Sequence, residues 1–484
     1  MIELIKNKQL IQNQLFINNE WLDAESGNTF RVKNPFDQSE LTEVSDGGPA
    51  DTQAAIEAAS NALGLWKILT AGERSAILRK WFNLIIKNQE DLATLLTLEQ
   101  GKPLMESRGE IAYGASFIEW FAEEAKRIYG DTIPGHQENK RIIVLKQPVG
   151  VVAALTPWNF PNAMITRKVA PALAVGCSVV IKPAEDTPLS ALALAQLAKE
   201  AGFPPGVINV VPTSNPGEVG EVLTSSPKVK KLSFTGSTAV GKLLMKQCAG
   251  TVKKLSLELG GNAPFIVFND SDIEKAVQGA IASKYRNAGQ TCVCANRIFV
   301  QEAIYDQFLA QFTSAVKGLK TGSGLEKVEI GPLINQKALD KVNRLLQDAE
   351  QKGGKVLEGG KLAIKDTTLF KPTVLADATA EMDISQEEVF GPVAPVYKFN
   401  TVQEVIEMAN DTSAGLAAYF YGNNNRVIWQ VAEELEYGMV GINTGMISTA
   451  VAPFGGIKES GFGREGSKYG IEDYLVTKYL CLEV

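Results

Sequence analysis

Two cysteines stand one residue apart in the stretch NAGQTCVCANR, at positions 292 and 294 of a 484-residue chain that holds five cysteines. A cysteine thiolate is a strong nucleophile, so Cys292 or Cys294 could attack an electrophilic carbon. The alternative is that both are small apolar side chains of the core, because free cysteine is among the most often buried residue types. The choice depends on which other reactive side chains accompany them.

General bases are scarce, because the one histidine of the chain, His136, lies in the polar stretch IPGHQENKR. We interpret His136 as a solvated loop residue, and we expect no metal site, since histidine-rich zinc sites are impossible. The general base is therefore expected to be a carboxylate. Glu258 in KLSLELGGNAPF is a candidate, because burial among leucines raises the pKa of a carboxyl toward neutrality. The alternative is an outward strand position that shares a polar face with Ser256.

Two motifs follow expected strands, where open α/β sheets bind their ligands. TPWNFP (156–161) contains Asn159, whose side-chain N–H groups could stabilise an oxyanion, although asparagine also suits turns. KPAE (182–185) contains Lys182 and Glu185, which could hold a cofactor's ribose or lie in solvent.

The stretch SFTGSTAVGKLL suggests a competing function, because it nearly matches a phosphate-binding loop from Gly236 to Lys242. A nucleotide hydrolase needs a serine or threonine next, as a ligand of Mg²⁺, and this chain has Leu243. The loop could instead pack beside a cofactor at the N-terminus of a helix.

The elements around these motifs predict two α/β units. Helical spacing begins at Asp51, an expected N-cap, and continues to Gly101. Short apolar strands then alternate with helices such as the one that Gly202 ends, which indicates a parallel sheet covered on both faces. A second series runs to about Pro453, with a boundary near 255–261. The expected strands are 150–157, 178–183, 208–212 and 231–236 in the first series and 263–268 and 297–300 in the second, with edge strands at 141–147 and 474–484.

Bulk composition narrows the class of protein. Hydrophobic residues make up 45% and charged residues 21%, with a mean hydropathy of −0.03, as in globular proteins. The net charge is −7 with no basic cluster, so neither nucleic acid nor a membrane surface is an expected partner. No apolar run has the length of a membrane span, and the N-terminal residues resemble no targeting peptide. Scattered, odd-numbered cysteines favour a cytoplasmic protein.

Taken together, TPWNFP, KPAE, FTGSTAVG, LELGGNAP, GQTCVCANR, EEVFGP and PFGGIKESGFGREGS resemble, in order and spacing, the aldehyde dehydrogenase superfamily. The match runs from about Phe16 to the end. Within the superfamily, MITRK, KYRNAGQTCVCANR and GIEDYLVTKYLC look most like the succinate-semialdehyde dehydrogenases.

The resemblance implies a reaction. Cys292 matches the family nucleophile, which forms a thiohemiacetal and then a thioester, and Glu258 matches the general base that activates water. Asn159 and the backbone N–H of Cys292 match the oxyanion donors. Cys294 is expected to take no catalytic step, although a strained disulfide with Cys292 is an open hypothesis.

The family pattern also implies a nicotinamide cofactor. We expect NAD to be preferred over NADP, because Glu185 would accept bonds from the ribose hydroxyls and repel an added phosphate, while Lys182 acts in the opposite sense. The matched cofactor residues are Thr156, Pro157, Trp158, Lys182, Glu185, Gly236, Ser237, Leu259, Glu388 and Phe390.

The subfamily resemblance maps a carboxylate-binding set onto Arg167, Arg286 and Ser448. It implies oxidation of succinate semialdehyde to succinate; glutarate semialdehyde or another short aldehyde is the alternative substrate, and a nucleotide hydrolase or a non-catalytic binding protein is the alternative class. Either arginine could instead form an ordinary ion pair.

The resemblance implies a Rossmann-like cofactor domain, a second α/β catalytic domain and a small bridging part through which dimers or tetramers assemble. The expected ranges are 1–123 with 148–255 for the cofactor domain, 256–453 for the catalytic domain, and 124–147 with 454–484 for the bridge.

Overall fold

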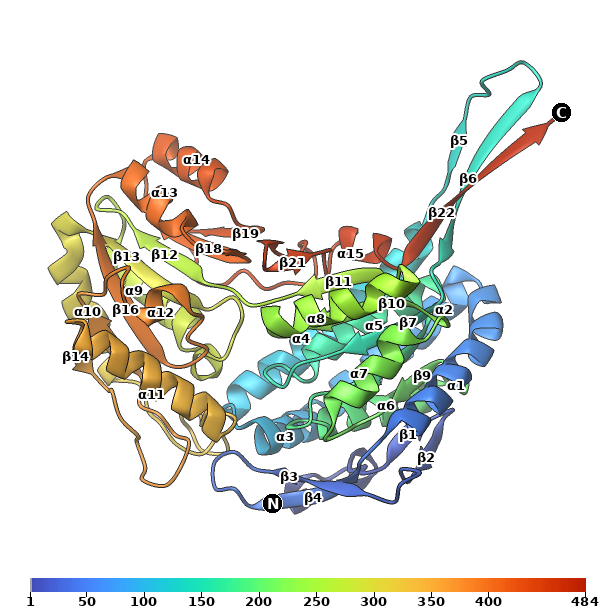
Figure 1. The fold of residues 1–484 in the computed structure, drawn as a ribbon, viewed down its shortest axis with the longest axis horizontal. Coiled ribbons are helices and arrows are strands. Elements are labelled where there is room, and N and C mark those ends of the chain that lie inside the picture. Colours follow the sequence, from blue (N-terminus) through green and yellow to red (C-terminus); the bar gives the residue numbers. More distant parts are fainter. Residues whose placement is uncertain (1) are drawn as a thin grey trace.

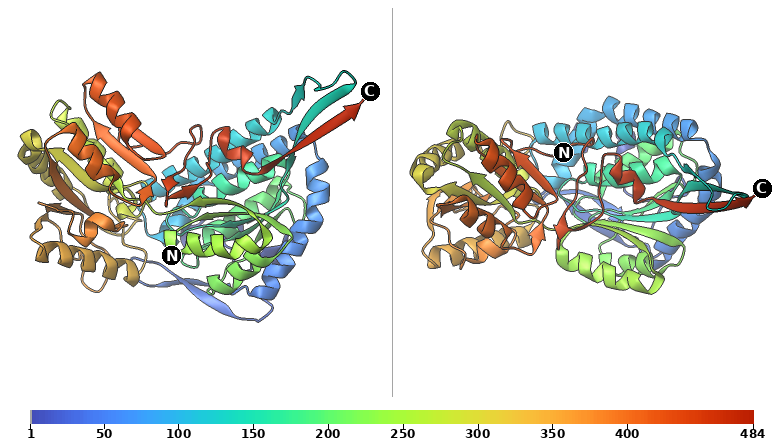
Figure 2. Two further views of the ribbon diagram at one scale, coloured as in Figure 1. Left: turned by 45° about the horizontal axis from the view of Figure 1, so that its top comes forward. Right: turned by 90° about the horizontal axis from the view of Figure 1, so that it is seen from above.

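The computed structural model describes residues 2–484, which form two α/β lobes and a projecting arm (Figure 1, Figure 2). One lobe is built on an eight-stranded sheet and the other on a seven-stranded sheet. The α/β fold class predicted from the alternation of strands and helices is confirmed. Within residues 2–484, no helix combines the length and the apolar character needed to cross a membrane.

The first sheet has a parallel centre. β9, β8, β7, β10 and β11 pair in parallel, so their carboxyl ends lie at one edge, while β1 and β21 flank them in antiparallel pairs. Every strand expected in this series is present. In spatial order the strands are β2 (Glu20–Leu22), β1 (Leu15–Ile17), β9 (Ile208–Val210), β8 (Ser178–Lys182), β7 (Val151–Leu155), β10 (Val229–Thr235), β11 (Lys254–Glu258) and β21 (Gly461–Phe462).

Helices cover both faces of this sheet, as Figure 1 shows, and a separate hairpin of β3 (Thr29–Lys33) and β4 (Glu40–Ser45) lies near the N-terminus. Gly101 and Gly202 end α3 and α6 as predicted, with φ of 91° and 94° that glycine adopts without strain. The helices are α1 (Pro49–Ile68), α2 (Ala71–Lys87), α3 (Gln89–Gln100), α4 (Leu104–Glu124), α5 (Ala163–Val175), α6 (Leu189–Ala201), α7 (Pro216–Ser225) and α8 (Thr238–Cys248).

The predicted N-cap at Asp51 is wrong. α1 begins two residues earlier, at Pro49, because proline is pre-set for the first helical turn and lacks the N–H that would otherwise be unpaired there. Gly48 is the N-cap, and the Asp51 carboxylate accepts the N–H groups of Gly48 and Glu25 at 2.9 and 3.0 Å. The aspartate therefore stabilises the helix start from its third position.

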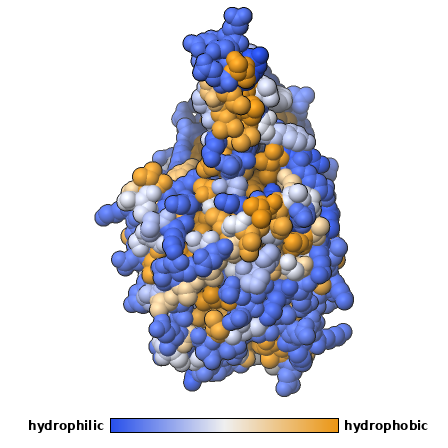
Figure 3. All heavy atoms as spheres, turned by 90° about the vertical axis from the view of Figure 1, so that its right-hand side faces the viewer, coloured by the Kyte–Doolittle hydropathy of each residue, from blue (hydrophilic) through white to orange (hydrophobic). Residues whose placement is uncertain are grey.

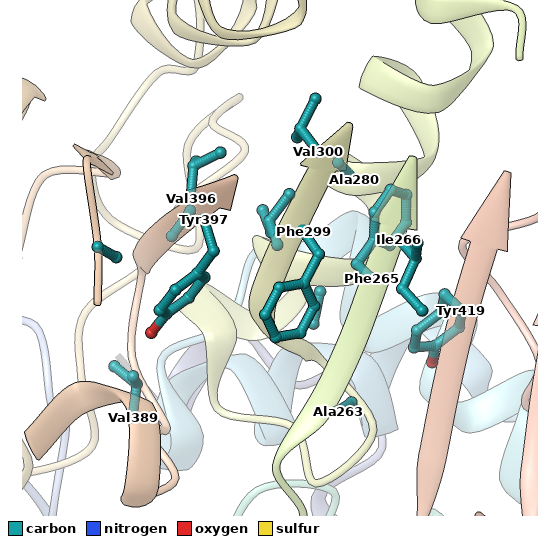
Figure 4. Close-up of a cluster of buried hydrophobic side chains, with 14 of the residues drawn as sticks. Ala263, Phe265, Ile266, Ala280, Phe299, Val300, Val389, Val396, Tyr397 and Tyr419 are labelled. Carbon is teal, nitrogen blue, oxygen red and sulfur yellow. The ribbon is translucent and has the colours of Figure 1, made fainter. Parts of the chain in front are cut away.

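The second sheet is parallel apart from the edge strand β14. Figure 4 shows Phe265, Phe299, Tyr397 and Tyr419 side by side on four of its strands, in the core of this lobe. In spatial order the strands are β14 (Lys355–Glu358), β15 (Thr373–Ala376), β16 (Val393–Phe399), β13 (Ala295–Gln301), β12 (Ala263–Val267), β18 (Ala417–Tyr421) and β19 (Met439–Ile442). The helices are α9 (Ile273–Lys284), α10 (Tyr305–Lys317), α11 (Gln336–Gln351), α12 (Asp383–Gln386), α13 (Val402–Asn410) and α14 (Asn425–Glu434).

The chain crosses between the lobes between Glu258 and Ala263, which overlaps the predicted boundary region 255–261 but lies beyond the end of the expected cofactor range at 255. β11 keeps its parallel pairing with β10 as far as Glu258, which lies opposite Thr235, and β12 begins only at Ala263. β21, inside the expected bridging range 454–484, also pairs with β11. Glu258 therefore belongs to the first sheet, and the short links β17 (Ala414–Gly415) and β20 (Ile457–Lys458) lie between the lobes with α15 (Tyr469–Glu472) nearby.

The arm consists of the two segments that sequence analysis set outside both series. β22 (Leu475–Glu483) pairs antiparallel with β6 (Lys140–Pro148) along its whole length, and β5 (Asp131–Ile133) completes a three-stranded sheet. Figure 1 shows this arm leaving the body of the first lobe, and Figure 3 shows apolar atoms along it below a hydrophilic tip. Its exposed apolar residues are Ile133, Ile143, Leu145, Val476, Tyr479 and Leu482.

Candidate active site

Cys292 lies in a cleft of about 370 Å³ between the two lobes. It occupies a tight turn, in which the Cys294 N–H donates to the Thr291 carbonyl at 3.0 Å. Most of the residues expected around a cofactor line the same cleft. They include Pro157, Trp158, Gly236, Ser237, Leu259, Glu388 and Phe390, and the predicted oxyanion donor Asn159 lines it too.

The loop before Cys292 has an unusual backbone. Asn287 and Ala288 adopt left-handed φ of 52° and 54°, and Gly289 follows at 75°. A Cβ on Gly289 would lie 2.2 Å from the Gly391 carbonyl oxygen, so this glycine allows the loop to pack closely against the EEVFGP segment. The Glu106 carboxylate accepts the Asn287 N–H at 2.8 Å. The loop that carries the nucleophile is therefore held from α4 as well as from its own lobe.

Burial raises the pKa of the Cys292 thiol to about 12. Arg167 and Arg286 act in the opposite direction, while the carboxylates of Glu388 and Glu258 add to the rise. The thiol is therefore protonated near neutral pH and needs a proton acceptor before it can attack. Two arginines and two glutamates therefore shift the pKa of this one thiol, in opposite directions.

Glu258 ends β11, and it is only 3% exposed. Neither of its carboxyl oxygens has a hydrogen-bond partner among the residues that the structure describes. Burial, and next the nearby Glu465 carboxylate, raise its pKa well above the ordinary value. The alternative of a solvated polar face is wrong, since Ser256 is equally buried and bonds Lys231 and Asp473. Glu258 is thus a buried carboxyl near the nucleophile with a raised pKa and no partner among the described residues, suited to exchanging protons.

Asn159 is held by both lobes. Its Nδ2 donates to the Gln290 carbonyl at 3.1 Å, which leaves one N–H of the amide for a ligand, and its Oδ1 has no partner within residues 2–484. The Asn159 carbonyl accepts the Lys102 ammonium at 2.7 Å and the Asn287 amide at 2.9 Å. This fixed amide beside Cys292 suits the predicted role of oxyanion donor.

Cys294 is buried beneath the same turn. Its Sγ lies 3.3 Å from the Gly289 carbonyl, to which it can donate, and 4.0 Å from the Lys284 ammonium. Burial raises its pKa, and the nearby Lys284 lowers it. Cys294 thus packs below the nucleophile and does not line the cleft, and its redox role stays a hypothesis.

The cofactor side of the cleft offers unpaired polar groups. The hydroxyls of Thr156 and Thr235, at the carboxyl ends of β7 and β10, are buried and lack partners in the described part of the chain. A Cβ on Gly236 would lie 2.4 Å from the Phe234 ring, so glycine leaves room at the start of α8, where Ser237 is the N-cap. Such a set fits a ligand that carries hydroxyls and phosphates, as a dinucleotide does.

At the expected adenosine end of the cofactor site, the side chains of Lys182 and Glu185 form an ion pair. The Lys182 ammonium lies 3.3 Å from the Glu185 carboxylate, and Glu185 is exposed while Lys182 is buried. At the other end, Trp158 and Phe390 meet edge to face at 5.5 Å. Burial raises the pKa of Glu388 to about 7, while the Gly261 N–H, which it accepts at 3.1 Å, lowers it.

Of the three residues predicted to bind the substrate carboxylate, only two line the same cavity. Arg286 and Ser448 line one narrow cavity on the side of the Cys292 turn away from the cofactor groups, and the Arg286 guanidinium lies 5.2 Å from the Phe160 ring. Arg167 is fully buried and forms an ion pair with Glu465, so the alternative of an ion pair is realised for this arginine. Its Nη2 has no partner among residues 2–484.

The comparisons with known proteins decide the family. The model of the aldehyde dehydrogenase family matches residues 21–480. The chain belongs to the aldehyde dehydrogenase family. A glutarate-semialdehyde dehydrogenase of Pseudomonas putida is 61% identical over 99% of this chain and 100% of its own, and an NADP-named succinate-semialdehyde dehydrogenase of Escherichia coli is 60% identical over 99% of both. A solved succinate-semialdehyde dehydrogenase of Burkholderia pseudomallei, 57% identical, matches with a TM-score of 0.98 over 99% of this chain and 100% of its own.

The expected resemblance is thus confirmed, and aldehyde dehydrogenases use NAD(P). The nucleotide-hydrolase alternative finds no support, because Lys242 of the phosphate-loop-like stretch forms a surface ion pair with Glu459 at 2.7 Å. Sequence analysis missed four charged residues that hold the loops and the arginine of this aldehyde dehydrogenase site in place. They are Lys102, Glu106, Glu110 and Glu465. A charged residue at a helix position where the apolar pattern predicts burial is the signal that could have identified Glu106 and Glu110 on α4.

Proposed function

We propose that this aldehyde dehydrogenase oxidises succinate semialdehyde to succinate with NAD(P). The carrying observation is that Cys292 lines a cleft that suits a dinucleotide, while Arg286 and Ser448 line a crevice beside the Cys292 turn, with Thr291 and Val293, that is too narrow for a water molecule in this structure. An arginine on the far side of the nucleophile suits an aldehyde that carries a carboxylate at its other end. The names of the 61% and 60% identical relatives agree with a dicarboxylic semialdehyde.

In the proposed first step the Cys292 thiol gives its proton to solvent water and its sulfur attacks the aldehyde carbon, which gives a thiohemiacetal. The Asn159 amide and the Cys292 N–H donate to the oxygen on which negative charge develops. When NAD(P) is bound, its nicotinamide accepts the hydride that leaves this carbon, and a thioester remains on Cys292.

In the second step Glu258 accepts a proton from water, whose oxygen attacks the thioester carbon, and the C–S bond breaks to release the acid and restore the Cys292 thiol. The raised pKa of Glu258 suits this role, since a base works best when its pKa lies near the working pH. The absence of a resident partner leaves its oxygens free to contact water.

The deciding assay measures NAD(P)H formation with succinate semialdehyde, glutarate semialdehyde and butanal in parallel. Highest kcat/KM with succinate semialdehyde supports the proposal, and highest kcat/KM with glutarate semialdehyde would establish the alternative substrate. Cys292→Ala is the control, because it should abolish all three activities. A preference for butanal would contradict a carboxylate-binding site.

For the coenzyme we propose a preference for NAD with NADP also accepted. The exposed Glu185 carboxylate would accept bonds from ribose hydroxyls, although its pairing with Lys182 at 3.3 Å weakens the repulsion of a 2′-phosphate. The E. coli relative is named for NADP, so the deciding measurement is kcat/KM of this enzyme with NAD and with NADP. Equal or higher catalytic efficiency with NADP than with NAD would overturn the preference.

We further propose a homodimer or homotetramer assembled through the arm, and a cytoplasmic location in line with five free cysteines. The Cys292–Cys294 disulfide is proposed only as an oxidised state. Peroxide inactivation without a loss of about two mass units would exclude it.

A further inference from the structure

Tyr113 on α4 carries a buried hydroxyl with no assigned role. No hydrogen-bond partner for this hydroxyl is present among residues 2–484. Its ring meets Phe117 edge to face at 4.9 Å and packs against the small apolar cluster of Phe160, Ala163 and Met164. A buried hydroxyl without a partner costs about 1–3 kcal/mol, so its position calls for an explanation.

Both arginines of the carboxylate end act on this hydroxyl. Burial raises the pKa of Tyr113, while Arg167 and Arg286 lower it and Glu465 raises it; the Arg167 side chain also lies close enough to the hydroxyl to lower this pKa through a hydrogen bond, although no bond of full geometry joins the two. The phenol is therefore neutral at physiological pH and can donate its proton in a hydrogen bond. The aromatic ring that Arg286 contacts, Phe160, belongs to the same cluster against which Tyr113 packs.

A second unpaired donor lies in the same region. The Nε of Arg167 forms an ion pair with the Glu465 carboxylate, but its Nη2 has no hydrogen-bond partner of full geometry within the described residues. The Arg167 guanidinium lies 4.3 Å from the Phe454 ring, which restricts how it can turn. The Tyr113 hydroxyl and the neighbouring Arg167 guanidinium, together with the nearby Arg286, form a buried donor set in which the hydroxyl proton and Nη2 have no acceptor of full hydrogen-bond geometry among residues 2–484.

The position of Tyr113 on α4 brings it to the site. Residues 106, 110, 113 and 117 share one face of the helix by their spacing. Glu106 accepts the Asn287 N–H, next to Arg286, and Glu110 accepts the N–H groups of Asn162 and Ala163 at 2.9 and 3.2 Å. The same face that anchors the loops of Arg286 and Asn159 thus carries the Tyr113 hydroxyl.

We propose that Tyr113 determines specificity: its hydroxyl donates a hydrogen bond to the carboxylate of the substrate, together with Nη2 of Arg167 and the guanidinium of Arg286. This inference rests on the proposed function and adds a neutral donor to its charged set. It predicts a site selective for an aldehyde with a distal anion. It does not require Tyr113 to take part in the chemical steps at Cys292.

Tyr113→Phe tests this with the ring and its packing kept. We expect KM for succinate semialdehyde to rise about tenfold or more, as for the loss of a hydrogen bond to a charged group. The kcat, and both constants for butanal, should stay within twofold. Tyr129→Phe, at an exposed tyrosine just beyond α4, is the matched control and should change nothing.

Calorimetric titration of the enzyme with succinate gives a readout that does not depend on turnover. Weaker succinate binding by Tyr113→Phe supports the inference even if another aldehyde proves to be the substrate. Unchanged succinate binding and unchanged KM would overturn it, and so would equal losses with succinate semialdehyde and butanal, which indicate a packing role. If the wild-type enzyme oxidises neither semialdehyde yet binds succinate through Tyr113, the proposed function fails and the anion site stands.

Discussion

At the scale of single residues, the site depends on carboxyls and a thiol that the fold keeps neutral. Glu258 has no partner and a raised pKa, and the Cys292 thiol has a pKa of about 12. Since a carboxyl with a raised pKa becomes a base only as the pH rises, the hydrolysis step should accelerate with pH. Burial of both reactive groups thus favours their protonated forms.

The Glu258→Gln variant should form the thioester and then stall, because glutamine cannot accept a proton from water. We expect a pre-steady-state burst of NAD(P)H close to one per site, followed by turnover reduced by about a hundredfold or more. The rise of kcat with pH should disappear in this variant. Stopped-flow absorbance across a pH series measures both effects, and full turnover by the variant would remove Glu258 from the role.

The two arginines should respond differently to truncation. Arg286→Ala should lower kcat/KM for succinate semialdehyde by about ten- to a hundredfold and leave butanal nearly unchanged, because only a charge-assisted bond is lost. Arg167→Ala should impair both substrates, since it removes one of the two cations that pair with the buried Glu465 and leaves Lys168 as the other. Parallel kinetics on both aldehydes decide this, and equal losses in Arg286→Ala would show that it maintains the fold.

At the scale of elements, carboxylates from one helix hold the ends of others. Glu99, the penultimate residue of α3, accepts the N–H groups of Leu189 and Ser190 at 2.7 and 2.8 Å, where α6 begins. This contact provides the cap that Pro188 cannot, since proline has no side-chain acceptor. Burial raises the pKa of Glu99 to about 8, while its bonds to Ser190 and Leu189 lower it.

This pKa makes the stability of the first lobe depend on pH. The carboxyl binds its proton more tightly in the folded state, where its pKa is about 8, than in the unfolded state, where it is 4.5. Stability should therefore fall as the pH rises from about 4.5 to about 8, by at most roughly 5 kcal/mol at about 1.4 kcal/mol per unit. In Glu99→Gln this fall should be smaller, and the remainder should come from groups such as Asp186, whose pKa burial raises to about 6. Thermal unfolding followed by circular dichroism between pH 5 and 8 tests it, and parallel curves for both proteins would contradict it.

Sequence patterns predicted elements better than their exact limits and supports. Hydrophobic periodicity located β7, β8, β9 and β10 of the first sheet but only β12 and β13 of the second, because each of these is a short, mostly buried run, and glycine located the ends of α3 and α6. The start of α1 was misplaced because Pro49 outweighed the capping preference of Asp51. The contacts of Arg167 with Glu465 and of Lys102 with Asn159 could not be predicted, since they join residues far apart in the chain and leave no local pattern.

At the scale of the whole molecule, the arm carries apolar surface away from the body of the first lobe (Figure 1, Figure 3). Leu145 and Leu482 are 39% and 43% exposed, and each ends a run of consecutive apolar residues, 142–145 on β6 and 479–482 on β22. An exposed three-stranded sheet with apolar side chains has two unprotected faces and favours pairing with a second chain. The arm is therefore the surface at which we expect copies of the protein to associate.

The double variant Leu145→Asp with Leu482→Asp should shift the protein from an oligomer toward the 52.2 kDa monomer, because two charges would have to be desolvated in the interface. Size-exclusion chromatography with light scattering measures the mass directly. Leu65→Asp with Ile68→Asp is the matched control, since these residues are exposed and apolar but lie on α1. Cys292 and its partners lie outside the arm, so monomers that form should keep the burst of NAD(P)H. An unchanged mass for the arm variant, or a wild-type protein that is already monomeric, would show that the arm does not mediate assembly.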